Sequence, residues 1–167
     1  MKEYEELGHM EPVKSQEGRQ TWYFLPHHLV FKETSNKTKT RVLFDGSAKT
    51  SNGLSPNDIL QVRPTVQRDL YFIVLRFGTN QVCFTADIAK MYRQINVHPQ
   101  DRDLQGILWR YSSDEPIQEY KLTTVTYGTS SAPYLATRCI KKLADDNKCQ
   151  YPRAVKCWGM IFTSMTY

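Results

Sequence analysis

The sequence predicts an α+β fold with a mostly antiparallel sheet. Two pairs of strand-forming segments are each joined by a turn signal, which is typical of hairpins. Two other segments carry apolar side chains at helical spacing. The resulting order is ββ, α, β, α, ββ, α, in which hairpins and helices alternate. With 167 residues, of which 40% are apolar, the chain can bury the core of one domain.

The first third of the chain is predicted to hold a connector, a hairpin and a loop. Residues 1–20 are polar, and we expect a connector there. Residues 21–31 are rich in strand formers, although Pro26 makes this an edge or interrupted strand. A second strand over 41–45 completes a hairpin whose tip, residues 32–40, is basic. Residues 46–64 are rich in Gly, Ser, Asn and Pro and are predicted to form a loop.

The middle of the chain is predicted to place an aspartate at the end of a buried strand. Before it comes a helix that ends at Gly78, with an apolar stripe at Val66, Leu70, Ile73, Val74 and Phe77. Residues 82–86 are predicted to form the strand, and Asp87 follows directly. A helical turn is expected within residues 88–96.

A second hairpin and a last helix complete the predicted fold. Residues 104–111 and 120–126 have strand character, and Asp114-Glu115-Pro116 between them is a turn signal. Ser131-Ala132-Pro133 is a typical helix start. The expected apolar face of that helix consists of Leu135, Cys139, Ile140 and Leu143.

Composition narrows the class of protein without deciding it. The net charge of +5 permits binding to nucleic acid through phosphate contacts, but it equally fits a solvated basic surface. The apolar runs are too short to cross a bilayer, and the polar N-terminus is not a secretory signal, so we expect no membrane and a cytoplasmic or nuclear setting. The four cysteines have no metal-ligand spacing and are expected to be free thiols.

Three segments suggest phosphoryl-transfer chemistry, although each has a plainer interpretation. Asp87 at a strand end suits a magnesium ligand, but by itself such an aspartate is more often a cap for the next turn. Gly128, before the helix start at 131–133, would let the backbone approach a ligand, or could simply join a strand to a helix. Arg41 in the basic hairpin could grip a triphosphate or remain a solvated charge.

Together these segments resemble, in order and spacing, the reverse transcriptases of BEL/Pao-class long-terminal-repeat retrotransposons. The resemblance covers roughly residues 3–157. Its matching stretches are Leu7–Val13, Trp22–His28, Arg41–Lys49, Pro64–Gln67, Leu75–Phe77, Thr85–Gln94, His98–Pro99, Ile107–Arg110, Thr124–Gly128 and Ser131–Cys139.

The resemblance implies a role for each matching residue. Asp87 matches the first catalytic ligand of Mg²⁺, and Tyr92 matches the steric gate that excludes a ribose 2′-hydroxyl. Arg41 and Lys90 match positions near the incoming triphosphate, and Tyr127 and Gly128 match the turn that packs against the nucleotide. The implied fold, over residues 21–157, is the fingers and first part of the palm of a right-hand polymerase. The implied partners are a primer–template of RNA or DNA and deoxynucleoside triphosphates.

The second carboxylate motif of this family, Tyr-x-Asp-Asp, is missing from the 167 residues. Asp145-Asp146 is a poor substitute, because it is expected to lie at a solvated helix end. One strand carboxylate does not hold two metal ions. We therefore expect an RNA-directed DNA polymerase fragment that is inactive alone.

The tail, residues 158–167, departs from the family pattern. If its permitted codons are read with two nucleotides dropped, they can spell Gly-Asp-Asp-Phe-Tyr-Val-Asp-Asp, which contains the missing motif. We therefore expect a frameshift near residues 155–158. Two other interpretations stay open: a non-catalytic nucleic-acid-binding remnant, and a full polymerase made by restoring the frame. The oligomeric state is not predicted.

Overall fold

A computed structural model of the chain describes residues 1–13, 23–32, 39–62, 64, 66, 69–79, 81–82, 86–153 and 155. The chain divides into two compact units, residues 1–61 with 92–132 and residues 62–91 with 133–167. The described strands all lie in the first unit, and they are antiparallel within two sheets, which bears out the α+β class.

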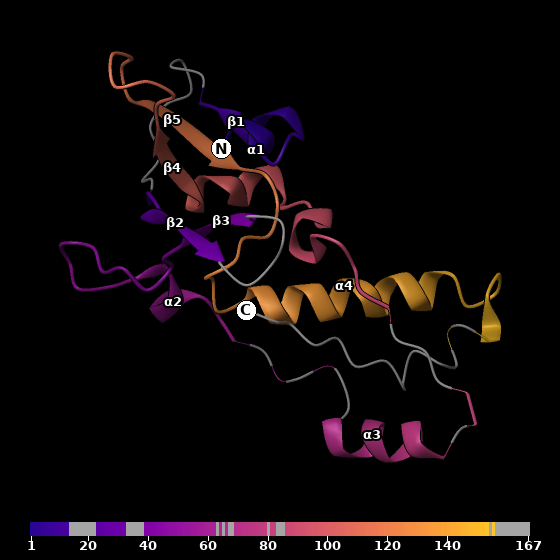
Figure 1. Ribbon diagram of the computed structural model, residues 1–167. Coiled ribbons are helices and arrows are strands. Elements are labelled where there is room, and N and C mark those ends of the chain that lie inside the picture. The colour runs from indigo at the N-terminus through magenta and orange to yellow at the C-terminus, as the bar shows by residue number, and fades with distance from the viewer. Residues whose placement is uncertain are drawn as a thin grey trace. The chain divides into compact units, whose positions relative to one another are not determined.

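A three-stranded sheet forms one part of the first unit. Its central strand, β5 (Gln118–Leu122), lies between β1 (Met10–Pro12) and β4 (Gly106–Trp109). Figure 1 shows β1 and β4 on either side of β5. Antiparallel pairing of Ile107 with Tyr120 confirms the predicted second hairpin.

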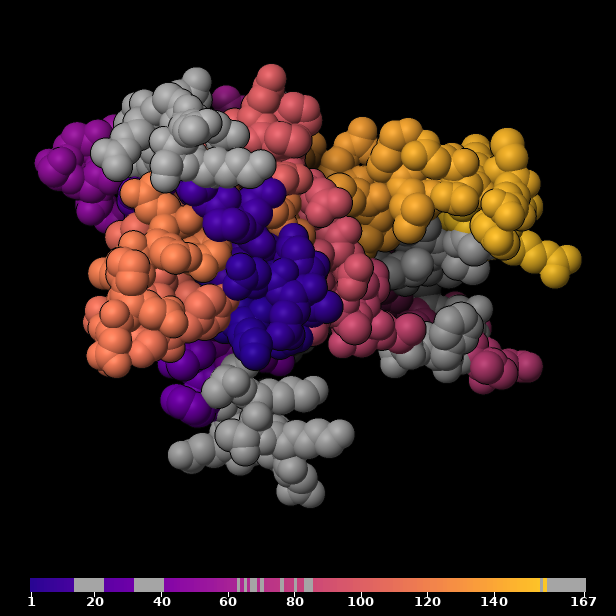
Figure 2. Space-filling view, turned by 90° about the horizontal axis from the view of Figure 1, so that it is seen from above, coloured from indigo at the N-terminus to yellow at the C-terminus, as the bar shows by residue number. Residues whose placement is uncertain are grey.

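The expected connector over residues 1–20 is wrong for its first half, because this segment is part of the core. Helix α1 (Lys2–Glu6) leads into β1, in which Met10 pairs with Leu122. Figure 2 shows the indigo N-terminal segment lying against the orange hairpin. Tyr4 and Met10 are only 6% and 2% exposed. Residues 14–20 lie outside the described residues.

The side chain of Arg93 holds Tyr4 in place. Its guanidinium carbon lies 3.8 Å from the centroid of the Tyr4 ring, and it also donates a hydrogen bond to the Tyr4 hydroxyl. Such a cation–π contact contributes roughly 0.5–2 kcal/mol. Burial raises the pKa of Tyr4, and the charge of Arg93 partly opposes this shift.

The predicted first hairpin is confirmed, with β2 (His27–Lys32) antiparallel to β3 (Lys39–Phe44). Pro26 directly precedes β2, so the strand starts later than its composition suggested. The expected tip falls at residues 33–38, outside the described residues. Val42 and Phe44 are buried, whereas Arg41, directly before Val42, is exposed and therefore lies on the opposite face of the hairpin.

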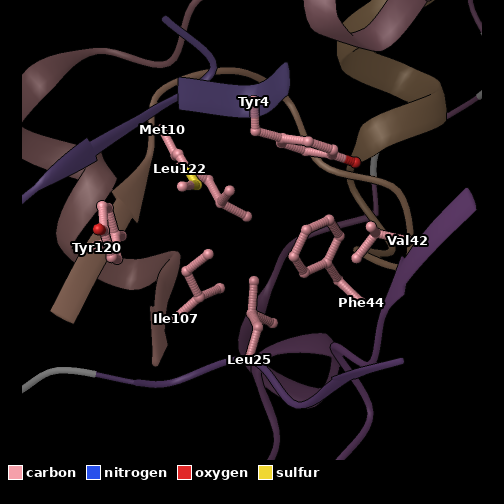
Figure 3. Packing of buried hydrophobic residues seen from close by; sticks show 8 residues of the cluster. All are labelled: Tyr4, Met10, Leu25, Val42, Phe44, Ile107, Tyr120 and Leu122. Carbon is pink, nitrogen blue, oxygen red and sulfur yellow. The ribbon is translucent and has the colours of Figure 1, made fainter. Parts of the chain in front are cut away.

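The core of the first unit joins the hairpin to the sheet. Figure 3 shows its side chains converging from α1 and from strands of both sheets. Leu25 reaches this core from the segment before β2, because its N–H donates to the Gly106 carbonyl at 2.8 Å. Full burial of such a side chain contributes about 1.5–3 kcal/mol. The members are Tyr4, Met10, Leu25, Val42, Phe44, Ile107, Tyr120 and Leu122.

The predicted loop over 46–64 contains a short helix, α2 (Pro56–Ile59). Asp58 caps it by accepting hydrogen bonds from the Ser55 N–H at 2.9 Å and from the Ser55 hydroxyl at 2.8 Å. These hydrogen bonds lower the pKa of Asp58. A single turn of helix is too short to show an apolar period, so the loop composition concealed it.

The second unit holds helix α3 (Leu70–Gly78) and all but the first residue of helix α4 (Ala132–Asp146). Both predicted helices are present, and α3 ends at Gly78 as predicted, but it begins at Leu70, so Val66 of the predicted stripe lies before the helix. Of the α3 stripe, Ile73 is buried, whereas Val74 and Phe77 are exposed. No helix in the described ranges is long and apolar enough to cross a membrane.

The predicted apolar face of α4 is wrong. Leu143 is 65% exposed, and Leu135 and Cys139 are exposed as well. The buried positions of the helix are instead Ala132, Ala136 and Thr137. Small side chains allow close packing, and a stripe of large apolar residues does not reveal them.

The expected buried strand before Asp87 is not seen in its described part. Val82 is 83% exposed, and Ala86 and Asp87 are exposed and have no strand pairing. Residues 83–85 lie outside the described residues, as do Cys157 and the whole expected tail, 158–167. The helical turn expected within 88–96 is confirmed as the 3₁₀ helix η1 (Met91–Gln94), and a second, η2 (Pro99–Leu104), follows it.

Candidate functional site

An extension of β5 brings two distant aromatic positions together. After Leu122 the chain stays extended, and the Val97 N–H donates to the Thr123 carbonyl at 2.8 Å. The Val125 N–H donates to the Ile95 carbonyl at 2.9 Å. This antiparallel pairing places η1 beside the turn that follows Thr126.

Tyr92 and Tyr127 meet at this junction. Their ring centroids are 4.4 Å apart and the ring planes are inclined by 71°, an edge-to-face contact. Such pairs add about 0.5–1.5 kcal/mol beyond the burial of their area. Tyr92 is 4% exposed, so its ring is fixed in orientation, whereas Tyr127 is partly exposed.

Gly128 packs its backbone against the end of β3. Its φ angle is +95°, and a Cβ at this position would lie 1.9 Å from the Phe44 carbonyl oxygen. A Cβ on Gly46 would lie 2.6 Å from the Gly128 carbonyl oxygen. The close approach that the glycine allows is therefore made within the chain, between the turn and the residues that leave β3.

Asn57 on α2 links these two segments, and the sequence prediction did not include it. Its side-chain Nδ2 donates to Ser47 Oγ at 2.8 Å and to the Gly128 carbonyl at 3.0 Å. Its Oδ1 accepts from the Ser130 N–H at 2.8 Å. The only signal in the sequence is an asparagine one residue after a Ser-Pro pair, which predicts a turn rather than a long-range contact.

Arg41 lies on the strand that ends at this junction. It is exposed and lies three positions before Phe44, about 10 Å along a strand. In the register of the hairpin, Arg41 is opposite Val30, which is also exposed. The guanidinium is therefore available to a ligand on this face.

Asp87 and Lys90, also assigned by the resemblance, belong to the second unit. Asp87 is exposed, and Lys90 has a positive φ of 51°, which an L-residue rarely adopts. In the part of the chain that the structure describes, no three His, Cys, Asp or Glu side chains group to hold a metal ion. The described residues therefore do not fit a two-metal centre, for which Asp87 supplies a single carboxylate.

Asp145 and Asp146 are exposed at the end of α4, as predicted, and Asp146 pairs with Lys142 one turn earlier. Cys139 and Cys149 are free thiols, also as predicted.

Compared with known protein families, the chain matches no family model, and compared with curated proteins it matches none significantly.

Proposed function

We propose that this chain is the fingers and first palm portion of a reverse transcriptase, and that its first unit binds a deoxynucleoside triphosphate. One observation supports this most. Tyr92 and Tyr127 come from distant parts of the sequence, were assigned to one nucleotide, and lie 4.4 Å apart. Gly128, assigned to the same nucleotide, rests on the end of the strand that carries Arg41.

The chemistry of these residues suits the parts of a nucleotide. Tyr127 is partly exposed and can present a flat apolar ring surface to a sugar or base, and the buried Tyr92 ring supports it. Arg41 offers a planar guanidinium that can bind a phosphate through two hydrogen bonds. Arg41, which would bind phosphate, lies three positions along the strand from Phe44, where the Tyr127–Gly128 turn approaches the backbone. This separation suits the extended shape of a nucleoside triphosphate.

The proposal is limited to binding for these 167 residues by themselves. They contain no Tyr-x-Asp-Asp sequence, and the one aspartate assigned to metal is too little for phosphoryl transfer by two ions. We therefore expect nucleotide binding without primer extension.

The test is equilibrium dialysis of labelled dATP against the full chain. We expect saturable binding that weakens about tenfold, or ~1.4 kcal/mol, in Arg41→Ala. The matched control is Arg110→Ala, which removes an exposed arginine from a turn where it donates to the Ser113 carbonyl. Equal weakening in both variants, or no binding by the unaltered chain, would contradict the proposal.

The same samples also test the alternative function, that of a non-catalytic nucleic-acid-binding remnant. A remnant that only binds nucleic acid would bind a primer–template duplex with an affinity that falls steeply as salt rises. It would show no saturable binding of dATP. That pair of results would replace the nucleotide-binding proposal.

A further inference from the structure

The side chain of Asn57 joins α2 to two other segments of the chain. Asn57 bonds to Ser47, ten positions earlier, and to Gly128 and Ser130, which lie 71 and 73 positions later. Its backbone N–H also donates to the Gly46 carbonyl, at 3.0 Å. Both ends of the amide are therefore used, one as a donor and the other as an acceptor.

The surroundings leave little freedom for this side chain. A Cβ on Gly46 would lie 3.0 Å from Asn57 Oδ1, which shows how closely the backbone leaving β3 approaches the amide. The helix that carries Asn57 is itself fixed by the hydrogen bonds between Ser55 and Asp58. Helix α2 thus fixes the position of the Asn57 amide, and the amide in turn binds the turn at residues 128–130.

The chemistry of the contact selects asparagine. Aspartate keeps the acceptor for the Ser130 N–H, but it places a charged oxygen against the Gly128 carbonyl oxygen, where Nδ2 now donates. Alanine removes both contacts, and glutamine is longer by one methylene group. The Gly128 carbonyl belongs to the Gly128–Thr129 peptide, so its hydrogen bond with Asn57 fixes the backbone one residue after Tyr127.

We propose that Asn57 is a positioning residue, which holds the Tyr127–Gly128 turn in the conformation that presents Tyr127 to a nucleotide. The inference rests on the proposed nucleotide binding of the first unit. Asn57 acts through the turn and touches no nucleotide. Its chemistry, a donor to Gly128 combined with an acceptor for Ser130, decides whether Tyr127 stays against Tyr92.

The experiment compares Asn57→Asp, Asn57→Ala and Asn52→Ala in the full chain. Asn52 is the matched control because it lies in the same loop, and its Oδ1 accepts hydrogen bonds from its near neighbours Thr50 and Leu54. Two readouts are taken on each protein: amide NMR signals and hydrogen exchange of Gly128 and Ser130, and the affinity for dATP. Thermal unfolding is recorded to confirm that each variant is folded.

We expect Asn57→Asp to keep the Ser130 N–H protected at neutral pH, to shift the signals of Tyr127 and Gly128, and to weaken dATP binding about tenfold. Asn57→Ala should lose the protection as well, and Asn52→Ala should match the unaltered chain in both readouts. An Asn57→Asp protein with unchanged Tyr127 signals and unchanged dATP affinity would overturn the inference. So would a variant that only melts earlier while its folded form binds normally.

Failure of the proposed nucleotide binding would give a different result from failure of the positioning role. If the unaltered chain binds no dATP, nucleotide binding is wrong, and the NMR readout still decides whether Asn57 positions the turn. Unshifted Tyr127 and Gly128 signals in both Asn57 variants would then reject the positioning role too.

Discussion

The ring of Tyr127 stands edge-on to the ring of Tyr92, with 4.4 Å between their centroids. The pairing of residues 95–97 with 123–125 brings these rings together. Since Tyr92 is buried, its contact restricts the orientation of the Tyr127 ring, which is only partly buried.

Replacement of Tyr92 should change how the chain discriminates between sugars. If the ring blocks a ribose 2′-hydroxyl, Tyr92→Val opens space, and ATP should approach dATP in affinity. The change expected in the ratio of the two dissociation constants is about tenfold, the effect of ~1.4 kcal/mol. Tyr92→Phe keeps the ring and serves as the control. An unchanged ratio in Tyr92→Val would remove the gate assignment.

Gly128→Ala should destabilise the first unit far more than Gly53→Ala. Both glycines have positive φ angles, +95° and +81°, but only a Cβ at Gly128 would meet neighbouring backbone, at 1.9 Å, whereas nothing lies within 4 Å at Gly53. The shared cost of the left-handed conformation is about 1–2 kcal/mol, and the clash adds roughly 1–3 kcal/mol. Urea unfolding of both variants measures the difference. Equal losses would show that the close approach to Phe44 is absent in solution.

Met10→Ala should lower the free energy of unfolding by about 2–5 kcal/mol, because it empties a fully buried site in the core. Met10 is 2% exposed, whereas Leu7, three residues earlier, is 52% exposed. Leu7→Ala is therefore the control and should change stability by less than about 0.5 kcal/mol. Chemical denaturation distinguishes the two, and a silent Met10→Ala would restore the connector interpretation of this segment.

Backbone amides of α3 should exchange with solvent faster than those of β5. Among the α3 side chains that the structure describes, Ile73 is the buried one, and Phe72 and Leu75 are 58% and 51% exposed. Strand β5 has a partner strand on each side. Few buried contacts permit local opening at low free energy. Hydrogen exchange followed by mass spectrometry compares residues 70–78 with 118–122 in one sample, and similar protection would argue against a weakly held α3.

The sequence predicted the elements whose evidence is local. Both hairpins have turn signals between alternating strands, and both are present. Strand β1 was missed because three residues carry no pattern, and its partner lies more than a hundred positions further on. The face of α4 was wrong because the burial of Ala136 depends on packing space rather than on side-chain size.

The same difference between local and long-range evidence applies to the candidate site. A resemblance could assign Tyr92 and Tyr127 to one ligand, but the contact between their rings depends on the pairing of Asn96 with Thr124. Asn57 remained hidden for a similar reason, because its hydrogen bonds reach 71 and 73 positions along the chain. Interactions at such separations follow from topology, which a single sequence does not display.

The pairing of β1 with β5 also determines when the three-stranded sheet can form during synthesis. Met10 leaves the ribosome about 110 residues before its partner Leu122. At roughly 5–20 residues per second, the first strand waits on the order of 10 s for the second. During that interval Tyr4 and Met10 have no sheet to cover them, and they are open to a chaperone that recognises apolar segments. The pairing of β1 with β5 can form only when nearly three quarters of the 167 residues have been translated.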